Sequence, residues 1–109
     1  MTEATAIDAV MQALAVPTRR AVLERIVRSG EITVAALTLG SGVTQGAISQ
    51  HLKSLKQAGL VAERAQGRNV YYRARPEGLA PLADWMSHYG TFWRDRFADL
   101  RALLEEIEP

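Results

Sequence analysis

The stretch TQGAISQHLKSLKQAGL, residues 44–60, decides how this chain folds. Its apolar residues Ile48, Leu52 and Leu55 recur at helical spacing. On a helical wheel that turns about 100° per residue, all three lie within about 40° of Ile48. We therefore predict a helix that buries this edge, and the question becomes what its opposite face contacts.

The opposite face of this helix carries small hydrogen-bonding side chains and one cation, without a carboxylate: Gly46, Ser49, Gln50, Lys53 and Gln57. In a DNA major groove, serine and glutamine can bond base edges and lysine can bond a guanine or a phosphate, whereas an acidic side chain would be repelled. This favours a DNA-binding face. The alternative is an ordinary solvated face, because the same residue types occur there too.

The segments before this helix predict three more helices. Residues 5–15 space their apolar side chains as an amphipathic helix, and residues 17–29 begin with a proline and end before a glycine. Thr33 is expected to cap a short helix. Thr44 is expected to cap the helix of the opening stretch, and together these two helices predict a helix-turn-helix over residues 33–58.

The spacing of the apolar residues changes after the helix-turn-helix. Residues 60–75 hold two short runs rich in valine and tyrosine around a turn with glycine and asparagine, which predicts a two-stranded wing. Pro76 should end the second strand. From about residue 77 to residue 107 the helical period returns, which predicts one long helix.

The predicted terminal helix carries more apolar surface than so small a domain can cover. We infer that it packs against a second copy of the chain, together with the first helix, although folding back on its own core is the alternative. The predicted homodimer interface consists of Ile7, Met11, Trp85, Tyr89, Trp93, Phe97, Leu100 and Leu104.

Length and composition narrow the class of protein. A chain of 109 residues with 48% apolar residues suits one domain, residues 1–109, of a mainly α class with about five helices and a small β-hairpin. No apolar run is long enough for a membrane helix, and the N-terminus lacks the layout of a secretory signal. We expect a cytoplasmic protein without a membrane partner. The chain has no cysteine, which excludes disulfides and thiolate metal sites.

The net charge of +1 hides an uneven distribution. Residues 1–43 are neutral, residues 44–75 carry a net charge of +5, and residues 76–109 carry −4. A basic middle segment in a nearly neutral protein is typical of a surface that binds a polyanion, although chance segregation on a solvated face would look the same.

Three blocks of this sequence together resemble the ArsR family of bacterial winged-helix repressors: LAVPTRRAVLERI at 14–26, ISQHLKSLKQAGLV at 48–61 and GRNVYYR at 67–73. The resemblance covers about residues 7–107. It implies a homodimer built from the first and last helices, a recognition helix in the major groove and a wing that reaches the minor groove or the backbone. It also implies repression of a promoter that some signal relieves.

The resemblance assigns DNA contacts to the recognition helix and its cap, and to the wing: Thr44, Gln45, Ser49, Gln50, His51, Lys53, Arg64 and Arg68. His51 could instead bond between helices. Arg73 and Arg75 are expected as solvated charges on an edge strand. Arg19 and Arg20 are expected to pair with acidic neighbours, and contact with a phosphate is the alternative. Val16 departs from the family, because many relatives have a capping side chain there.

The familiar metal sites of the family are incomplete in this chain. The site on the last helix needs a histidine two residues after Asp84 and a later histidine, but Met86 and Ala98 occupy these positions. Asp84 and His88 are expected to form a helix-surface ion pair. We predict no metal site and no cofactor.

The effector could be a small molecule, a partner protein or the protein's own concentration. An aromatic cluster of the last helix could line an effector pocket instead of an interface.

These features predict a sequence-specific DNA-binding regulator, a repressor that binds double-stranded DNA at a pseudo-palindromic operator. The alternative is a winged-helix module that binds another protein. An enzyme is not expected, because Ser49 and His51 lie about 160° apart around their helix and cannot act as nucleophile and base.

Overall fold

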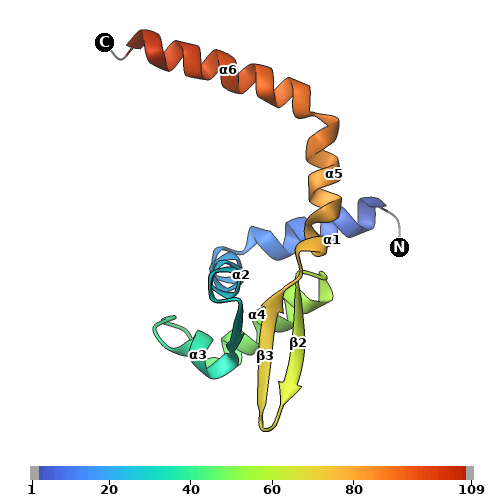
Figure 1. Ribbon diagram of the computed structural model, residues 1–109, viewed down its shortest axis with the longest axis vertical. Helices are drawn as coiled ribbons and strands as arrows, with labels where there is room; N and C mark the ends of the chain where they lie inside the picture. Colours follow the sequence, from blue (N-terminus) through green and yellow to red (C-terminus); the bar gives the residue numbers. More distant parts are fainter. Residues whose placement is uncertain (1–2, 108–109) are drawn as a thin grey trace.

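The computed structural model describes residues 3–107 and has the winged helix-turn-helix architecture (Figure 1). Its elements, in chain order, are α1 (Glu3–Ala15), α2 (Pro17–Ser29), β1 (Glu31–Thr33), α3 (Val34–Thr38), α4 (Gln45–Gln57), β2 (Val61–Gln66), β3 (Asn69–Ala74), the 3₁₀ turn η1 (Pro76–Leu79), α5 (Ala80–His88) and α6 (Gly90–Ile107). The predicted fold class is confirmed, with six helices in place of about five and with a third strand.

Helix-capping residues fix the ends of the helix-turn-helix. The hydroxyl of Thr33 accepts the N–H of Ala36 at the start of α3, and the hydroxyl of Thr44 accepts the N–H of Ala47 at the start of α4. Both predicted caps are confirmed. Val16 gives α2 no side-chain cap, as its residue type predicts, although Pro17 pre-sets the first turn of that helix.

Gly59 ends helix α4. Its φ of 78° lies in the left-handed region that favours glycine. The N–H of Leu60 donates to the carbonyl oxygen of Leu55 at 2.9 Å, and the N–H of Gly59 donates to that of Lys56 at 3.0 Å. These two bonds satisfy the last carbonyl groups of α4 and turn the chain into the wing.

The wing belongs to a three-stranded antiparallel sheet in the order β1-β3-β2. Strands β2 and β3 form the predicted hairpin, with Gln66 opposite Asn69 at its turn. Strand β1 pairs with the other side of β3, where Ile32 lies opposite Tyr72. The prediction of a two-stranded wing missed β1, because a strand of three residues is too short to show an alternating pattern.

The core lies where α1, α2, β1, α3, α4 and the start of β2 meet. Its buried side chains are Val10, Ala13, Val22, Ile26, Ile32, Leu37, Ile48, Leu52, Leu55, Leu60 and Val61. The predicted buried edge of the recognition helix is therefore confirmed. No residue from 62 to 107 is buried, so the core ends at the base of the wing.

The prediction of one continuous helix over residues 77–107 was wrong. The segment consists of η1, α5 and α6, and the helix is interrupted at Tyr89, whose φ and ψ of −112° and 14° are not helical. Gly90 follows, and glycine is a poor helix former, so the break falls beside a residue of low helix propensity. The apolar stripe continues across the break, which is why the spacing alone predicts a single helix.

The break sends α6 away from the rest of the domain. Helix α5 packs against α1, whereas α6 extends beyond both (Figure 1). The radius of gyration is 17.7 Å, against about 13 Å for a compact chain of this length. Within residues 3–107, none of the helices combines the length and the apolar character that crossing a membrane requires.

Candidate nucleic-acid interface

Helix α4 presents the polar face that the sequence predicts. Gln45, Ser49, Gln50 and Lys53 are exposed, whereas the opposite edge of the helix is buried in the core. The cap residue Thr44 is exposed beside them. Ser49, Gln50 and Lys53 share the side of the helix opposite that edge, and Gln45 lies at its first turn. No carboxylate lies among these four side chains. This face therefore offers hydrogen-bond donors, acceptors and one cation to the edges of base pairs.

His51 occupies a different environment from the rest of the predicted contact set. It is partly buried, and its Nδ1 atom is enclosed without a hydrogen-bond partner among the described residues. The structure therefore does not show the bond between helices that was expected as an alternative. Contact between His51 and DNA stays a prediction.

The guanidinium of Arg64 is paired with a carboxylate of another strand of the sheet. It forms two bonds with the carboxylate of Glu31 in β1, from Nη2 at 3.0 Å and from Nε at 3.1 Å. It also lies 4.9 Å from the centroid of the Tyr71 ring. The hydrogen bond from Arg64 lowers the pKa of Glu31. The two residues are 33 positions apart, so only the unrecognised strand β1 could have revealed this pairing.

The wing is also tied to the recognition helix. Lys56 in α4 forms an ion pair with Glu63 in β2, and the hydroxyl of Tyr72 in β3 donates to Glu63 at 3.0 Å. The hydrogen bond from Lys56, and then that from Tyr72, lower the pKa of Glu63. The single carboxylate of the basic middle segment is thus neutralised by its neighbours, and it links the wing to α4.

The cations of the basic middle segment divide into two groups. Lys56, Arg64 and Arg75 each pair with a carboxylate. The other three have no acidic partner within the described part of the chain: Lys53, Arg68 and Arg73. Lys53 lies on the exposed face of α4 and Arg68 in the turn of the wing, so these two predicted contacts carry charge that is not already compensated.

The predicted environments of four other arginines are only partly correct. Arg73 is solvated as predicted, but it lies on the central strand β3 and not on an edge strand. Arg75 is partly buried and bonds Glu77 and the carbonyl oxygen of Gly59. Arg19 and Arg20 form no ion pair among residues 6–107, and the Nε of Arg19 is buried without a partner there.

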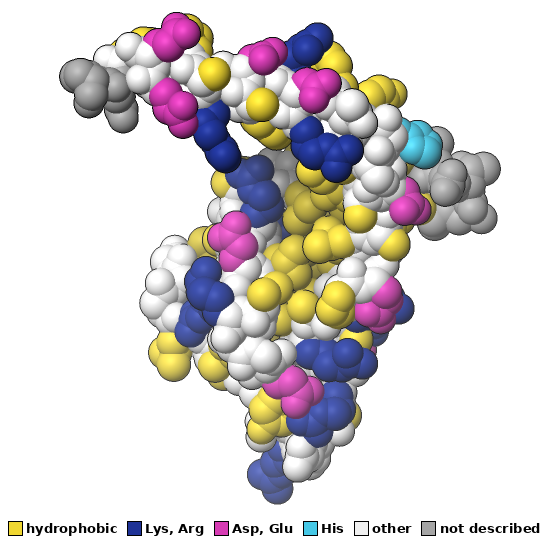
Figure 2. Space-filling view, turned by 45° about the horizontal axis from the view of Figure 1, so that its top comes forward, with side chains coloured by type: hydrophobic (Ala, Val, Ile, Leu, Met, Phe, Trp, Pro, Cys, Tyr) yellow, Lys and Arg dark blue, Asp and Glu magenta, His cyan; other side chains and the backbone are white. Residues whose placement is uncertain are grey.

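The predicted interface residues of the last two helices form an exposed apolar surface. Trp85 lies 5.4 Å from Tyr89 between ring centroids, and Trp93 stacks on Phe97 at 6.2 Å. Trp85 and Trp93 are each 41% exposed and Phe97 is 61% exposed. Figure 2 shows apolar side chains gathered in the hollow beneath α6. On α1, Met11 is exposed and Ile7 is half-buried.

Among the side chains that the structure describes, no three His, Asp or Glu residues lie close enough together to hold a metal ion. Asp84 and His88 do not form the ion pair that their spacing predicts, since no contact within 4.0 Å joins them.

Comparison with known proteins adds independent observations. A family profile described as a helix-turn-helix domain matches residues 14–64. The chain is 42% identical, over 84 residues, to the HTH-type transcriptional regulator Rv2034 of Mycobacterium tuberculosis, a match that covers 77% of this chain and 78% of that protein. It is 29% identical to the transcriptional repressor SdpR of Bacillus subtilis, over 73% of this chain and 88% of the repressor.

Solved structures also resemble this chain. An ArsR-like transcriptional regulator from Rhodococcus sp. RHA1 superposes with a TM-score of 0.72 at 28% identity, over 91% of this chain and 92% of that chain. A homodimeric winged helix-turn-helix DNA-binding domain from Mycobacterium bovis, described as a possible ArsR-family regulator, superposes with a TM-score of 0.64 at 30% identity, over 80% of each chain.

Proposed function

This chain belongs to the ArsR family of DNA-binding transcriptional regulators, and we propose that it represses a promoter by binding a pseudo-palindromic operator as a homodimer. Members of this family are regulators and not enzymes, and the relatives reported above are named for transcriptional regulation or repression. They therefore favour DNA binding over a winged-helix module that binds only proteins. Acting on promoter DNA would place the protein in the cytoplasm.

The exposed face of α4 is the observation that carries this proposal. Gln45, Ser49 and Gln50 would bond base edges, and Lys53 would bond a guanine or a phosphate. The buried edge of the helix fixes the direction of these side chains, because it is packed into the core. The backbone N–H groups at the start of α4, next to Thr44, would bond a phosphate.

The wing would make the second contact with DNA. Arg68 lies in its turn, beside Gly67 with a φ of 62°. An uncompensated guanidinium at this place suits a phosphate or the narrow minor groove. Arg64 would join it after exchanging the carboxylate of Glu31 for a phosphate oxygen, which makes its contribution smaller.

The homodimer would use the apolar surface of the terminal helices. Residues 91–107 are all exposed in the single chain, and the aromatic side chains of α5 and α6 lie on this surface. An apolar surface of this extent is typical of a protein interface. The solved structure from Mycobacterium bovis is described as homodimeric, which supports the same assembly here. Two recognition helices would then enter successive major grooves, about 34 Å apart.

From these proposed contacts we assign a role to each part of the single domain, residues 1–109. Residues 33–58 form the helix-turn-helix, residues 60–75 the wing, and residues 5–15 and 77–107 the dimerisation helices. Occupation of the operator by the dimer would block access of RNA polymerase to the promoter.

Binding of the purified protein to a fluorescent fragment of its own upstream DNA tests this function. We expect tight binding that survives an excess of random competitor DNA, with an affinity that falls as salt rises. The matched control is the same fragment with its inverted repeat scrambled. Equal affinity for the native, scrambled and random fragments would contradict the repressor function and favour the protein-binding module.

A further inference from the structure

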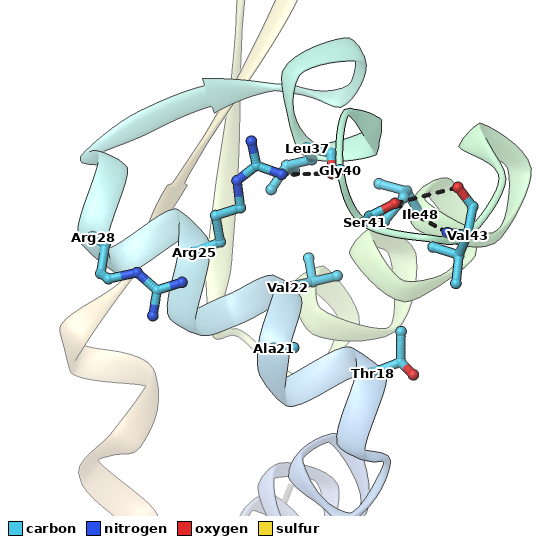
Figure 3. A pocket seen from close by; sticks show the side chains of 10 residues that line it. All are labelled: Thr18, Ala21, Val22, Arg25, Arg28, Leu37, Gly40, Ser41, Val43 and Ile48. Atoms are coloured by element: carbon cyan, nitrogen blue, oxygen red, sulfur yellow. Dashed lines mark hydrogen bonds between the residues drawn. The ribbon is translucent and has the colours of Figure 1, made fainter.

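A pocket of about 240 Å³ opens between α2 and the turn that leads from α3 into α4 (Figure 3). Val22, Leu37 and Ile48 form its inner wall and belong to the buried core. Ala21 and Val43 extend the apolar lining toward solvent. The inside of the pocket is therefore shaped for an apolar group.

Two arginines of α2 give the pocket a positive charge. Arg25 is fixed in place, because its Nη1 donates to the carbonyl oxygens of Leu37 and Leu39, both at 2.9 Å. Arg28 follows three residues later on the same side of the helix and forms no ion pair with the side chains that the structure describes. No carboxylate lines the pocket. An occupant with a negative charge would thus find cations without competition from an acidic neighbour.

We propose that this pocket binds a small organic carboxylate with an apolar body, and that the bound acid weakens operator binding. The volume corresponds to about eight water molecules at about 30 Å³ each, which accommodates one ring with a short substituent. The apolar body lies against Val22, Leu37 and Ile48, and the carboxylate bonds Arg28. An inorganic anion would leave the apolar wall unfilled.

The position of the pocket links its occupant to the recognition helix. The hydroxyl of Ser41 donates to the carbonyl oxygen of Thr38 at 2.8 Å and accepts the N–H of Val43 at 3.2 Å. Val43 lines the pocket and directly precedes Thr44, the cap of α4. A ligand that displaces Val43 therefore moves the first turn of the DNA-binding helix. This regulatory step rests on the proposed function, whereas binding of the acid does not.

The first test is ¹H–¹⁵N NMR of the full chain without DNA, titrated with benzoate as the probe. We expect shifts at the amides of residues 40–43 that saturate with a dissociation constant at or below about 10 mM, which corresponds to roughly 3 kcal/mol of binding. Arg28→Gln should weaken binding about tenfold, because a charged hydrogen bond is lost. Arg20→Gln removes the same charge from the same helix outside the pocket and should leave binding unchanged.

Two further probes separate the contribution of the anionic group to binding from that of the ring. Benzyl alcohol keeps the ring without the anion, and acetate keeps the anion without the ring; both should bind more weakly than benzoate. Operator affinity is then measured in saturating benzoate, with acetate at the same concentration as the control for ionic strength. We expect it to fall at least about fivefold, and by linkage operator DNA should weaken benzoate binding by the same factor.

Several outcomes would overturn the proposal. If the amides of residues 40–43 do not shift with benzoate, or shift equally in the Arg28→Gln variant, the pocket is not a carboxylate site. If benzoate binds but operator affinity is unchanged, the regulatory half is wrong. A protein that fails to bind operator in the absence of any ligand contradicts the proposed function instead, because benzoate binding is measured without DNA.

Discussion

Gly78 in η1 lies directly against the backbone of Gly59: a Cβ atom added to Gly78 would lie 2.1 Å from the carbonyl oxygen of Gly59. The N–H of Arg75 also donates to the carbonyl oxygen of Leu60 at 2.8 Å. The turn that follows α4 and the η1 segment that precedes α5 are therefore in backbone contact. Because α5 follows η1 directly, this contact positions the start of α5 relative to α4.

Replacement of Gly78 by alanine should destabilise the fold, because the added methyl group would have to displace main-chain atoms. We expect a loss of about 1–3 kcal/mol, as in other overpacked sites, measured by thermal unfolding. Gly46→Ala is the matched control, since its Cβ would meet only the Thr44 hydroxyl, at 3.9 Å. A Gly78→Ala variant as stable as the control would contradict the close contact.

Lys53→Ala and Ser49→Ala should affect DNA binding in different ways. Lys53→Ala should weaken binding to all sequences and reduce the slope of log affinity against log salt by about one, because one phosphate contact is lost. Ser49→Ala should narrow the difference between operator and random DNA by about 1 kcal/mol. Fluorescence titrations on both DNAs measure these effects. Equal losses on both DNAs from both variants would refute base readout by Ser49.

The Glu31–Arg64 pair should restrain the wing from binding DNA. Glu31→Gln would release the guanidinium of Arg64, so we expect higher affinity at low salt and a salt slope steeper by up to about one. Arg68→Ala should reduce that slope by about one, and Arg101→Ala, in α6, should leave it unchanged. Salt titrations with operator DNA provide the test. If Glu31→Gln has no effect, Arg64 does not reach the DNA.

Trp93→Ala should weaken the homodimer, because a large exposed indole on an apolar surface is typical of an interface hot spot. We expect a loss of about 2 kcal/mol or more in dimerisation free energy, measured by sedimentation equilibrium. Leu39→Ala is the control, since Leu39 is 74% exposed but lies at the end of α3. An unchanged dimer in the Trp93→Ala variant would place the interface elsewhere.

The lowered pKa of Glu63 predicts how the fold responds to acid. A carboxylate whose pKa is lower in the folded state stabilises the protein above its ordinary pKa of 4.5, and this contribution disappears as the pH falls through the folded pKa. Urea unfolding between about pH 5 and pH 3 should therefore show a steeper loss of stability in the native protein than in Glu63→Gln. Glu24→Gln removes an exposed carboxylate of α2 and is the matched control. Parallel curves for the native protein and Glu63→Gln would contradict the role of the Lys56–Glu63–Tyr72 network.

Local chemistry explains which parts of the fold could be predicted from the sequence. Thr33, Thr44 and Gly59 cap or end helices through bonds to residues at most five positions away, so a single sequence identifies them. The buried edge of α4 follows from helical spacing. Strand β1 was missed because its partner, β3, is about 40 positions away along the chain. The break at Tyr89 was missed because the apolar period continues across it.

The candidate site could be predicted less completely. The exposure of Ser49 and Lys53 follows from the wheel of α4, as the structure confirms. The pairing of Arg64 with Glu31, and the partial burial of His51, depend on how distant elements pack together. Residue type and spacing carry no information about such pairs, so charge counting along the chain overstated the free positive charge of the wing.

The proposed pairing of two chains through α6 would make this protein sensitive to its own abundance. When single chains are in excess, the number of pairs rises with the square of their concentration, so halving expression lowers the supply of pairs about fourfold. Repression would then set in over a narrow range of gene dosage. A cell that dilutes the protein by growth would reach this threshold without any chemical cue.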